Sequence, residues 1–520
     1  HGDHDWKFGV RYNYTELRRV SQINENGTFT FSTDAPFDPA NPRTYPERFS
    51  IRTGPYNEFI KNHTYEMFAQ DKWRVTPGTT LSLGIRYDLE LIPLDETGNP
   101  LFKDPNAFPV DKNNVSPRIG FTHSLDASGK SLIRGGYGVF YNRSILGFVD
   151  DTIEFGKFTS SNNVQFPSNA ADPGPAAGRL PTNPYLVNGP TVNRALLNQA
   201  FPPGVAVKNQ GVVVFDSPDR TQPYAHQFTV GYVREIPGGV AVHADYVRMM
   251  NRDMFLSKNI NPAVRVDTTR TGALTRQDAF GILGEPYTQQ VWLIENTGWS
   301  DYDALNLALE KRYSHNWSGR ISYSLSKSRG TAENQADRDT FSYLTDQNYD
   351  LWTGPSSVDR RHILSIGARA EIPKTHGANV STTIRYMSGA PFTIYNSAVD
   401  VNRNGELDDP VPAGTYSGTD PATSMQNVAF DGKRNGARGP DYFQADVRAG
   451  WHFQVQQHKT MEVFLDIFNI TNRANLDLPV TANRDLRFRG TSSDSFLVLT
   501  NLYGGGGFPR QAQLGFRFAF

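Results

Sequence analysis

Fourteen segments of this chain alternate apolar and polar residues, and the connections between them are alternately short and long. In the last segment, Leu514, Phe516, Phe518 and Phe520 fall on one face of a strand, because strand side chains point to alternate sides. Helical spacing is rare, with a weak case at 194–200, so the pattern predicts an all-β protein. The strands are expected near residues 5–15, 62–75, 79–91, 116–125, 131–142, 224–236, 240–250, 301–313, 317–329, 360–371, 379–390, 441–454, 459–469 and 509–520.

The connections indicate how these strands are arranged. The short ones contain the Gly, Pro, Asp or Asn residues of tight turns, as at Pro77-Gly78 and Pro237-Gly238-Gly239. Short turns at one end and long loops at the other are typical of outer-membrane barrels. We therefore predict a transmembrane antiparallel β-barrel with about 14 strands in this chain, short periplasmic turns and long extracellular loops. The long loops cover roughly 16–60, 93–115, 143–223, 251–299, 330–359, 391–440 and 470–508.

Composition excludes several other classes of protein. The 52 basic and 53 acidic residues give a net charge of −1, so no bulk field attracts nucleic acid. Cysteine is absent, which rules out disulfides and thiolate metal sites. No apolar run approaches the roughly 18 residues that a transmembrane helix needs. Since the chain starts at His1 without a leader sequence, we expect a removed signal or a part of a longer chain.

Several motifs resemble those of TonB-dependent outer-membrane receptors. Tyr65-Glu-Met-Phe-Ala-Gln-Asp-Lys-Trp-Arg74, followed by Leu83-Gly-Ile-Arg-Tyr-Asp88, is similar to one strand pair of that family. Asn114-Val-Ser-Pro-Arg-Ile-Gly-Phe121 with Arg134-Gly-Gly-Tyr-Gly138 is similar to the next. The resemblance extends over nearly the whole chain and is narrower to the Oar-like branch. The motifs that carry the narrower resemblance are Asp303-Ala-Leu-Asn306, Tyr323-Ser-Leu-Ser-Lys-Ser328, Asp359-Arg-Arg-His362, Ser388-Gly-Ala-Pro-Phe-Thr393, Arg434-Asn-Gly-Ala-Arg-Gly-Pro440 and Phe468-Asn-Ile-Thr-Asn472.

The resemblance implies a barrel of 22 strands, filled by an N-terminal plug and preceded by a TonB box. Since neither plug nor box is visible here, we expect 1–520 to be the C-terminal barrel part of a longer receptor. Alternatively, the fourteen strands close on their own as a narrower pore. Because the Oar-like branch also carries acidic loops, the resemblance further suggests calcium as a structural ion.

The implied function is TonB-energised uptake of an external ligand across the outer membrane of a Gram-negative-type bacterium. The implied partners are outer-membrane lipid, the barrel-assembly machinery, the TonB complex acting through the missing plug, and the external ligand. The loops 143–223 and 391–440 are the candidates for ligand capture. The alternatives are a passive outer-membrane pore or a surface adhesin on the same fold, and a soluble secreted β-protein.

One loop has the spacing of a cation site. In Asp400-Val-Asn-Arg-Asn-Gly-Glu-Leu-Asp-Asp409, oxygen side chains stand at relative positions 1, 3 and 5 and a glycine at 6, as in an EF-hand loop. The bidentate Glu at position 12 is missing, because Val411 stands there. The alternative is an acidic surface turn without metal. The candidate calcium ligands are Asp400, Asn402, Asn404, Glu406, Asp408 and Asp409.

Other residues are candidates for structural roles in a barrel. Asp359-Arg360-Arg361-His362 is either an inward charge cluster or the aqueous start of a strand, and the sequence favours the second alternative. The implied barrel-assembly signal consists of Phe516, Phe518 and Phe520. No His-Glu-x-x-His or Gly-x-Ser-x-Gly motif points to an enzyme, and the Gly504–Gly507 run lacks the strand-to-helix context of a phosphate loop. Arginines expected to face the lumen are Arg11, Arg86, Arg134 and Arg385, and tryptophans expected in an interfacial girdle are Trp6, Trp73, Trp292, Trp299 and Trp317.

Overall fold

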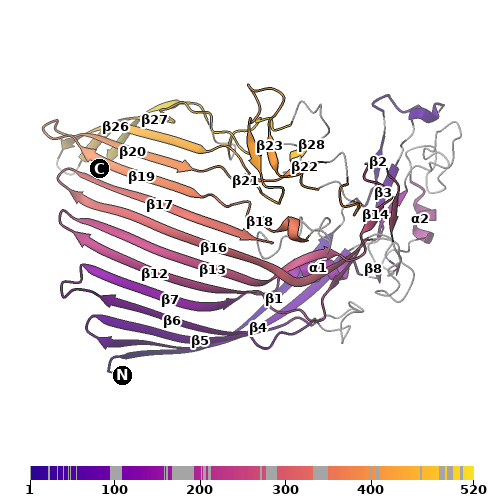
Figure 1. Cartoon of the computed structure of the whole chain (residues 1–520), viewed down its shortest axis with the longest axis horizontal. Helices are drawn as coiled ribbons and strands as arrows, with labels where there is room; N and C mark the ends of the chain where they lie inside the picture. The colour runs from indigo at the N-terminus through magenta and orange to yellow at the C-terminus, as the bar shows by residue number, and fades with distance from the viewer. Residues whose placement is uncertain are drawn as a thin grey trace.

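The computed structural model consists of a large curved sheet with folded loops at one end (Figure 1). No helix in the part of the chain that the structure describes is long and apolar enough to cross a membrane. The described residues are 2–21, 24–31, 33–38, 40–44, 46, 48–53, 56–93, 108–156, 158–159, 162–166, 192–200, 202, 207–208, 212–269, 272–276, 290–331, 349–396, 400–405, 409–456, 459–479, 486–488, 496–503 and 508–519.

Fourteen antiparallel strands follow one another across the sheet in chain order, which confirms the strands predicted from period two. Two short strands join its loop end: β11 (Val213–Asp216) pairs with β16 in parallel, and β18 (Gly354–Pro355) pairs with β17. The fourteen strands are β1 (His4–Ser21), β4 (Tyr56–Thr76), β5 (Thr79–Leu91), β6 (Val115–Ser124), β7 (Ser131–Tyr141), β12 (Tyr224–Ile236), β13 (Val240–Asn259), β16 (Val291–Ser314), β17 (Trp317–Gly330), β19 (His362–Glu371), β20 (Ala378–Met387), β26 (Tyr442–Gln456), β27 (Lys459–Phe468) and β29 (Gln511–Ala519).

The two outer strands of this wall are not joined to each other. Within the described residues, β1 pairs only with β4 and β29 only with β27. The alternative in which the fourteen strands close on themselves is therefore not what these residues form. Both ends of the chain lie at the end of the wall that carries the short turns (Figure 1).

Four strands run further into the loop region than the sequence predicts. β1, β4, β13 and β16 extend beyond the segments whose alternation marked them, and β13 and β16 reach 20 and 24 residues. The ladder between β13 and β16 is interrupted by register shifts at Asn251/Met254 and Met254/Leu256 before it continues to Asn259. Beyond a lipid-facing wall no apolar alternation is needed, so the pattern stops before the strands do.

The long loops contain secondary structure of their own. The weak helical spacing at 194–200 falls on α2 (Arg194–Ala200), whereas the sequence analysis did not identify α1 (Leu146–Glu154). The remaining elements are η1 (Pro42–Thr44), η3 (Tyr349–Trp352), β2 (Thr28–Thr30), β3 (Arg48–Thr53), β8 (Phe158–Thr159), β9 (Asn162–Phe166), β10 (Val207–Lys208), β14 (Ala263–Arg265), β15 (Leu274–Arg276), β21 (Pro391–Phe392), β22 (Ile394–Asn396), β23 (Gly414–Tyr416), β24 (Val428–Phe430), β25 (Ala437–Arg438) and β28 (Leu486–Phe488).

The buried apolar clusters lie in these loops. One joins the loop after β20 to residues 496–497 near the C-terminus, and two others join β11 to the loop-side extensions of β13 and β16. The wall, in contrast, exposes large apolar side chains such as Phe8 (71%), Val10 (80%) and Phe516 (70%). This inversion suits a wall whose outer face contacts lipid, where no soluble core is required. The cluster after β20 consists of Phe392, Ile394, Val411, Val428, Phe430, Ala437, Phe496 and Leu497.

Candidate functional site

The wall has an apolar face and a polar face, as period two requires. On β16, Leu305, Leu307 and Leu309 are exposed on one face, while the residues between them belong to the other. We call these the outward and the inward face. On the last strand, Phe516 and Phe518 lie on the outward face and Phe520 lies outside the described residues.

Two of the predicted arginines meet on the inward face around one buried carboxylate. Glu66 is only 3% exposed and lies opposite Arg11 in the β1–β4 ladder. Arg86 Nη2 lies 3.0 Å from Glu66 Oε2 and 2.8 Å from Asp88 Oδ1, and Arg143 pairs with the other Glu66 oxygen. The sequence analysis missed Glu66, which is a single acidic residue within a strand motif.

The other two predicted arginines lie apart from this group. Arg134 donates from Nη2 to Asp245 Oδ1 at 2.9 Å, across the width of β12. Arg385 is exposed and lies opposite Gln444 in the β20–β26 ladder. All four predicted arginines thus lie on the inward face, but they do not form one site.

Glu90 holds the two ends of the loop 143–223 together. Its Oε2 accepts the backbone N–H of Ser144 at 2.9 Å and the amide Nε2 of Gln222 at 2.7 Å, and its Oε1 accepts Asn62 Nδ2 at 2.6 Å. Glu90 and Gln222 also line a cavity of about 140 Å³ together with Asn114. One carboxylate therefore fixes the base of the largest candidate capture loop.

A buried ion pair lies next to this base. The guanidinium of Arg220 stands 4.3 Å from the ring centres of both Phe108 and Phe255 and pairs with Asp216. Burial raises the pKa of Asp216 to about 6, although the positive charge of Arg220 acts in the opposite direction. The pair connects the loop 93–115 with β11 and the extension of β13.

Helix α1 carries three buried carboxylates that the sequence analysis also missed. Asp150, Asp151 and Glu154 come within 4.8 Å of one another, the one such group in the part of the chain that the structure describes. Arg19 pairs with Asp150 and Glu154, and Arg52 pairs with Glu154. These contacts attach α1 to β1 and β3, so the group has a structural role. Its signal in the sequence was the spacing of acidic residues on one helical face.

The predicted acidic loop folds as a tight turn around Asp400. This residue is completely buried, and it accepts the backbone N–H groups of Asn404 (3.0 Å) and Gly405 (2.8 Å). Gly405 has φ +92°, a left-handed conformation that a glycine adopts without strain. Asp409 accepts the N–H of Val401 at 2.6 Å. The glycine turn expected from the motif is therefore present.

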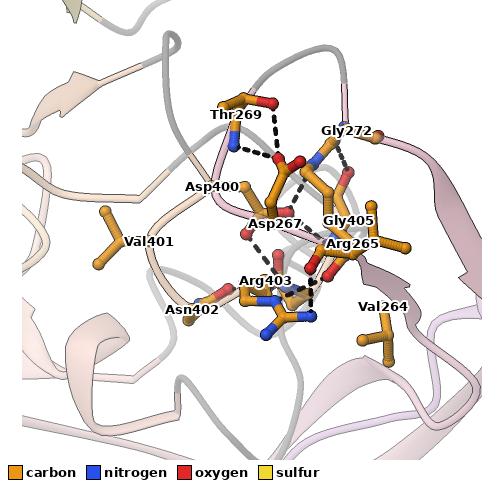
Figure 2. A network of polar contacts seen from close by, with 12 residues as sticks. Val264, Arg265, Asp267, Thr269, Gly272, Asp400, Val401, Asn402, Arg403 and Gly405 are labelled. Atoms are coloured by element: carbon orange, nitrogen blue, oxygen red, sulfur yellow. Dashed lines mark hydrogen bonds and ion pairs between the residues drawn. The ribbon is translucent and has the colours of Figure 1, made fainter.

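A guanidinium from another loop supplies positive charge to this turn (Figure 2). Arg265 at the end of β14 donates from Nε to Asp400 Oδ2 at 2.9 Å and from Nη2 to the carbonyl of Gly405 at 3.0 Å. In return, Arg403 donates to the carbonyls of Arg265 and Val266, both at 2.7 Å. We call this reciprocal contact the arginine clasp, and it joins two loops that are 135 positions apart.

The clasp bears on the calcium prediction. Both Asp400 oxygens already accept hydrogen bonds, and Arg265 is only 4% exposed. A cation at Asp400 would have to stand beside this buried guanidinium, which repels it. Asn402 accepts the N–H of Asn404 through Oδ1, while Glu406 and Asp408 lie outside the described residues. The described oxygen atoms, which already accept hydrogen bonds, therefore do not fit a divalent ion, and calcium binding stays a prediction.

Another buried carboxylate occupies the motif before β19. Asp359 is 2% exposed, accepts the N–H of Ser328 at 2.7 Å and pairs with Arg438. It is part of a charge cluster, so the preferred interpretation as an aqueous strand start was wrong for this residue. Trp292 also departs from its predicted place in the girdle, because it packs against the buried loop cluster of β11 and β16.

Near the clasp, local hydrogen bonds stabilise the charged form of Asp267. Thr269 donates both its hydroxyl and its N–H to Asp267 (Figure 2). These bonds hold the pKa of Asp267 below its ordinary value, since they stabilise the carboxylate. Asp267 is therefore ionised at neutral pH, beside the two arginines of the clasp.

A sheet of long antiparallel strands with an apolar outward face, a polar inward face and folded external loops defines a transmembrane β-barrel wall. The sequence model of the outer membrane beta barrel domain matches residues 1–513. The chain therefore belongs to the outer membrane beta barrel family, and its place is the outer membrane. No curated protein matches the chain in sequence.

Solved structures with a similar fold are outer-membrane transporters and receptors. The transporter YddB from Escherichia coli is 16% identical, with a TM-score of 0.54, and the match covers 100% of this chain and 52% of that one. The siderophore receptor PirA from Acinetobacter baumannii is 11% identical, with a TM-score of 0.46, and the match covers 99% of this chain and 52% of that one. This chain thus spans about half the length of these proteins.

Proposed function

We propose that this chain is the barrel part of a receptor that takes up an external ligand through the outer membrane with energy from TonB. The observation that carries the proposal is the folded state of the loops. We call the described parts of the long loops, together with the loop-side extensions of the strands, the cap, and it has its own buried clusters and inter-loop ion pairs. Such order is expected of loops that present a fixed surface to a ligand, because preorganisation reduces the entropy lost on binding. A passive pore needs no such cap.

The inward face offers a place for a plug. Gly84, Gly120, Gly136 and Gly138 lie on three neighbouring strands and line a hollow of about 430 Å³. Glycines leave room for a second backbone to approach closely. We propose that this hollow receives the plug of the longer receptor, which TonB then displaces to open the lumen.

Ferric siderophores are the first ligands to test. The names of several solved neighbours state such ligands, among them PirA as a siderophore receptor. We propose that the loops 143–223 and 391–440 capture a ligand of this class, without covalent chemistry. We propose that the acidic loop in 391–440 stiffens this surface through its contact with Arg265. Calcium, which the sequence suggested for this loop, is tested separately.

The test uses cells that express the full gene and ⁵⁵Fe-labelled ferric siderophores. We expect binding to intact cells, and accumulation that stops when a protonophore collapses the energy source of TonB. A variant lacking residues 167–191 within the first capture loop should lose binding, while a deletion of the same length in an unrelated outer-membrane protein should not. Accumulation that ignores the protonophore, together with ion conductance in a planar bilayer, would instead identify a passive pore.

A further inference from the structure

The outward face changes from apolar to charged at one level on three neighbouring strands. Tyr246, Leu305 and Leu325 lie side by side on β13, β16 and β17. Two residues nearer the loops, or roughly 7 Å along each strand, the outward positions are charged on all three strands. These positions are Arg248, Asp303 and Lys327.

From this level towards the loops, the outward face contains more cations than carboxylates. Arg248 Nη1 lies 3.3 Å from Asp303, and Arg252 Nη1 lies 2.7 Å from Asp301. Arg329 stands opposite Asp301 in the β16–β17 ladder, and it is exposed. We call Arg248, Arg252, Lys327 and Arg329 the cationic patch, whose four positive charges surround two carboxylates.

Two members of the patch keep their charge available. Within the described residues, neither Lys327 nor Arg329 forms an ion pair with a carboxylate. Both are exposed on the outward face. The patch therefore has a net charge of +2 directly above the apolar rows.

Histidine–tyrosine pairs border the patch on both sides. The hydroxyl of Tyr137 lies 2.8 Å from His226 Nδ1, and the hydroxyl of Tyr323 lies 2.8 Å from His362 Nδ1. When a tyrosine donates to Nδ1, the imidazole proton is on Nε2, which then is a further donor. His226 lies beside Met250 at the patch, and His362 lies beside Leu325 just below it.

The opposite end of the same strands is different. Lys311 on the outward face is 7% exposed, and its Nζ donates to Ser314 O at 2.8 Å and to Trp317 O at 3.2 Å. It also stands 4.5 Å from the Trp317 ring centre. The ammonium group of Lys311 is thus bound by the carbonyls and the Trp317 ring of its own turn. On the outward face of these three strands, the exposed positive charge therefore lies at the loop end.

We propose that the cationic patch binds the phosphate group of an anionic lipid in the outer leaflet. A lipid fits both parts of this surface, because its acyl chains cover the row of Leu305 while its phosphate meets Lys327 and Arg329. Arginine and lysine are the usual phosphate-binding side chains, and the histidine Nε2 groups add hydrogen-bond donors.

The test measures the lipid preference of the whole receptor that contains this chain, in nanodiscs. Spin-labelled phosphatidic acid and phosphatidylcholine are compared at matched mole fractions, for the wild type and the Lys327→Gln/Arg329→Gln variant. A control variant, Arg312→Gln/Lys374→Gln, removes two exposed cations at the turn end. We expect a preference for phosphatidic acid that falls by about thirtyfold in the patch variant and stays in the control.

Three results would overturn the proposal. The preference would persist in the patch variant, or the control variant would lose it equally because only net charge matters. In the third case, millimolar inorganic phosphate would abolish the preference, which would identify a site for free phosphate. Heat-modifiable gel mobility serves as a check that each variant keeps its folded barrel.

Discussion

The two ends of the barrel wall are built by different means. At the turn end, local backbone chemistry is sufficient: His315 and Asn316 between β16 and β17 take φ angles of 54° and 65°. Such paired positive φ angles match the twist of a hairpin. At the loop end, the contacts join segments far apart in sequence, such as Arg265 and Asp400 across 135 positions. The turn end is thus determined locally, whereas the loop end depends on which loops meet.

This difference predicts where single substitutions act over long distances. A turn substitution should change its own hairpin and at most the strand beside it, because its hydrogen bonds reach no further. The carbonyl of Gly239, for example, accepts the N–H of Arg312 on β16. A substitution of a buried charge in the cap should release two loops together. The predictions below test this contrast from the largest effect to the smallest.

Removing the buried guanidinium of the arginine clasp should have the largest effect. Arg265→Ala leaves Asp400, which is 0% exposed, without its charged partner. We expect the local opening free energy of both loops to fall by about 4 kcal/mol. Hydrogen exchange of residues 263–276 and 400–405 measures this. Arg403→Ala is the matched control, since Arg403 donates only to backbone carbonyls there, and it should cost about 1 kcal/mol. Equal effects of the two substitutions would contradict the clasp.

Removing the carboxylate at the base of the first capture loop should have the next largest effect. Glu90→Ala leaves Asn62, Ser144 and Gln222 donors without an acceptor, and we expect a loss of about 3 kcal/mol of local stability. Faster proteolysis within 143–223 measures it. Glu235→Ala, which changes an exposed residue at the turn end, should leave that rate unchanged. If both variants are cleaved at the wild-type rate, Glu90 does not hold the loop.

Calcium and a chelator test whether Arg265 or a metal ion balances the charge of Asp400. If Arg265 provides the counter-charge, a chelator should leave wild-type hydrogen exchange at 400–405 unchanged. Millimolar calcium should then protect the Arg265→Ala variant more than the wild type, because Asp400 is free to bind it. Loss of protection in the wild type on chelation would establish a resident calcium ion instead.

A smaller effect should follow pH at the buried pair of Asp216 and Arg220. Because burial raises the folded pKa of Asp216 to about 6, above an unfolded value of about 4, its contribution to stability is complete below the unfolded value. It is lost as the pH rises through 6. Hydrogen exchange of β11, corrected for intrinsic rates, should therefore show weaker protection at pH 7 than at pH 4. Asp216→Asn should remove this slope, and an unchanged slope would assign it to another group.

The smallest effect should come from the turn end. Gly238 and Gly239 take φ angles of 91° and 73°, so Gly239→Ala places a side chain in a left-handed conformation. The expected loss is about 1 kcal/mol. Hydrogen exchange should rise only in the turn between β12 and β13 and at Arg312, whose N–H donates to the Gly239 carbonyl. A change at the cap would break the contrast between the two ends.

The wall could be predicted from the sequence because its signals are local. Apolar alternation and turn residues identified all fourteen strands of the wall. The cap could not, because partners such as Glu66 and Glu90 are single acidic residues whose importance depends on loops folding back to them. The acidic loop was recognised as a turn, but nothing local in its sequence indicated that Arg265 would meet it.

The register shifts between β13 and β16 separate the loop-side part of this strand pair from its lipid-facing part. Asp253 takes φ 54° at this break. The pairing register between β13 and β16 on the loop side of the break differs from the register on the turn side. A residue inserted above the break changes the pairing there without sliding the lipid-facing rows. Changes in the loop-side part of this strand pair therefore need not disturb the part embedded in the bilayer. On the loop side of Met254, insertions are instead limited by buried contacts such as those of Phe255 and Leu256.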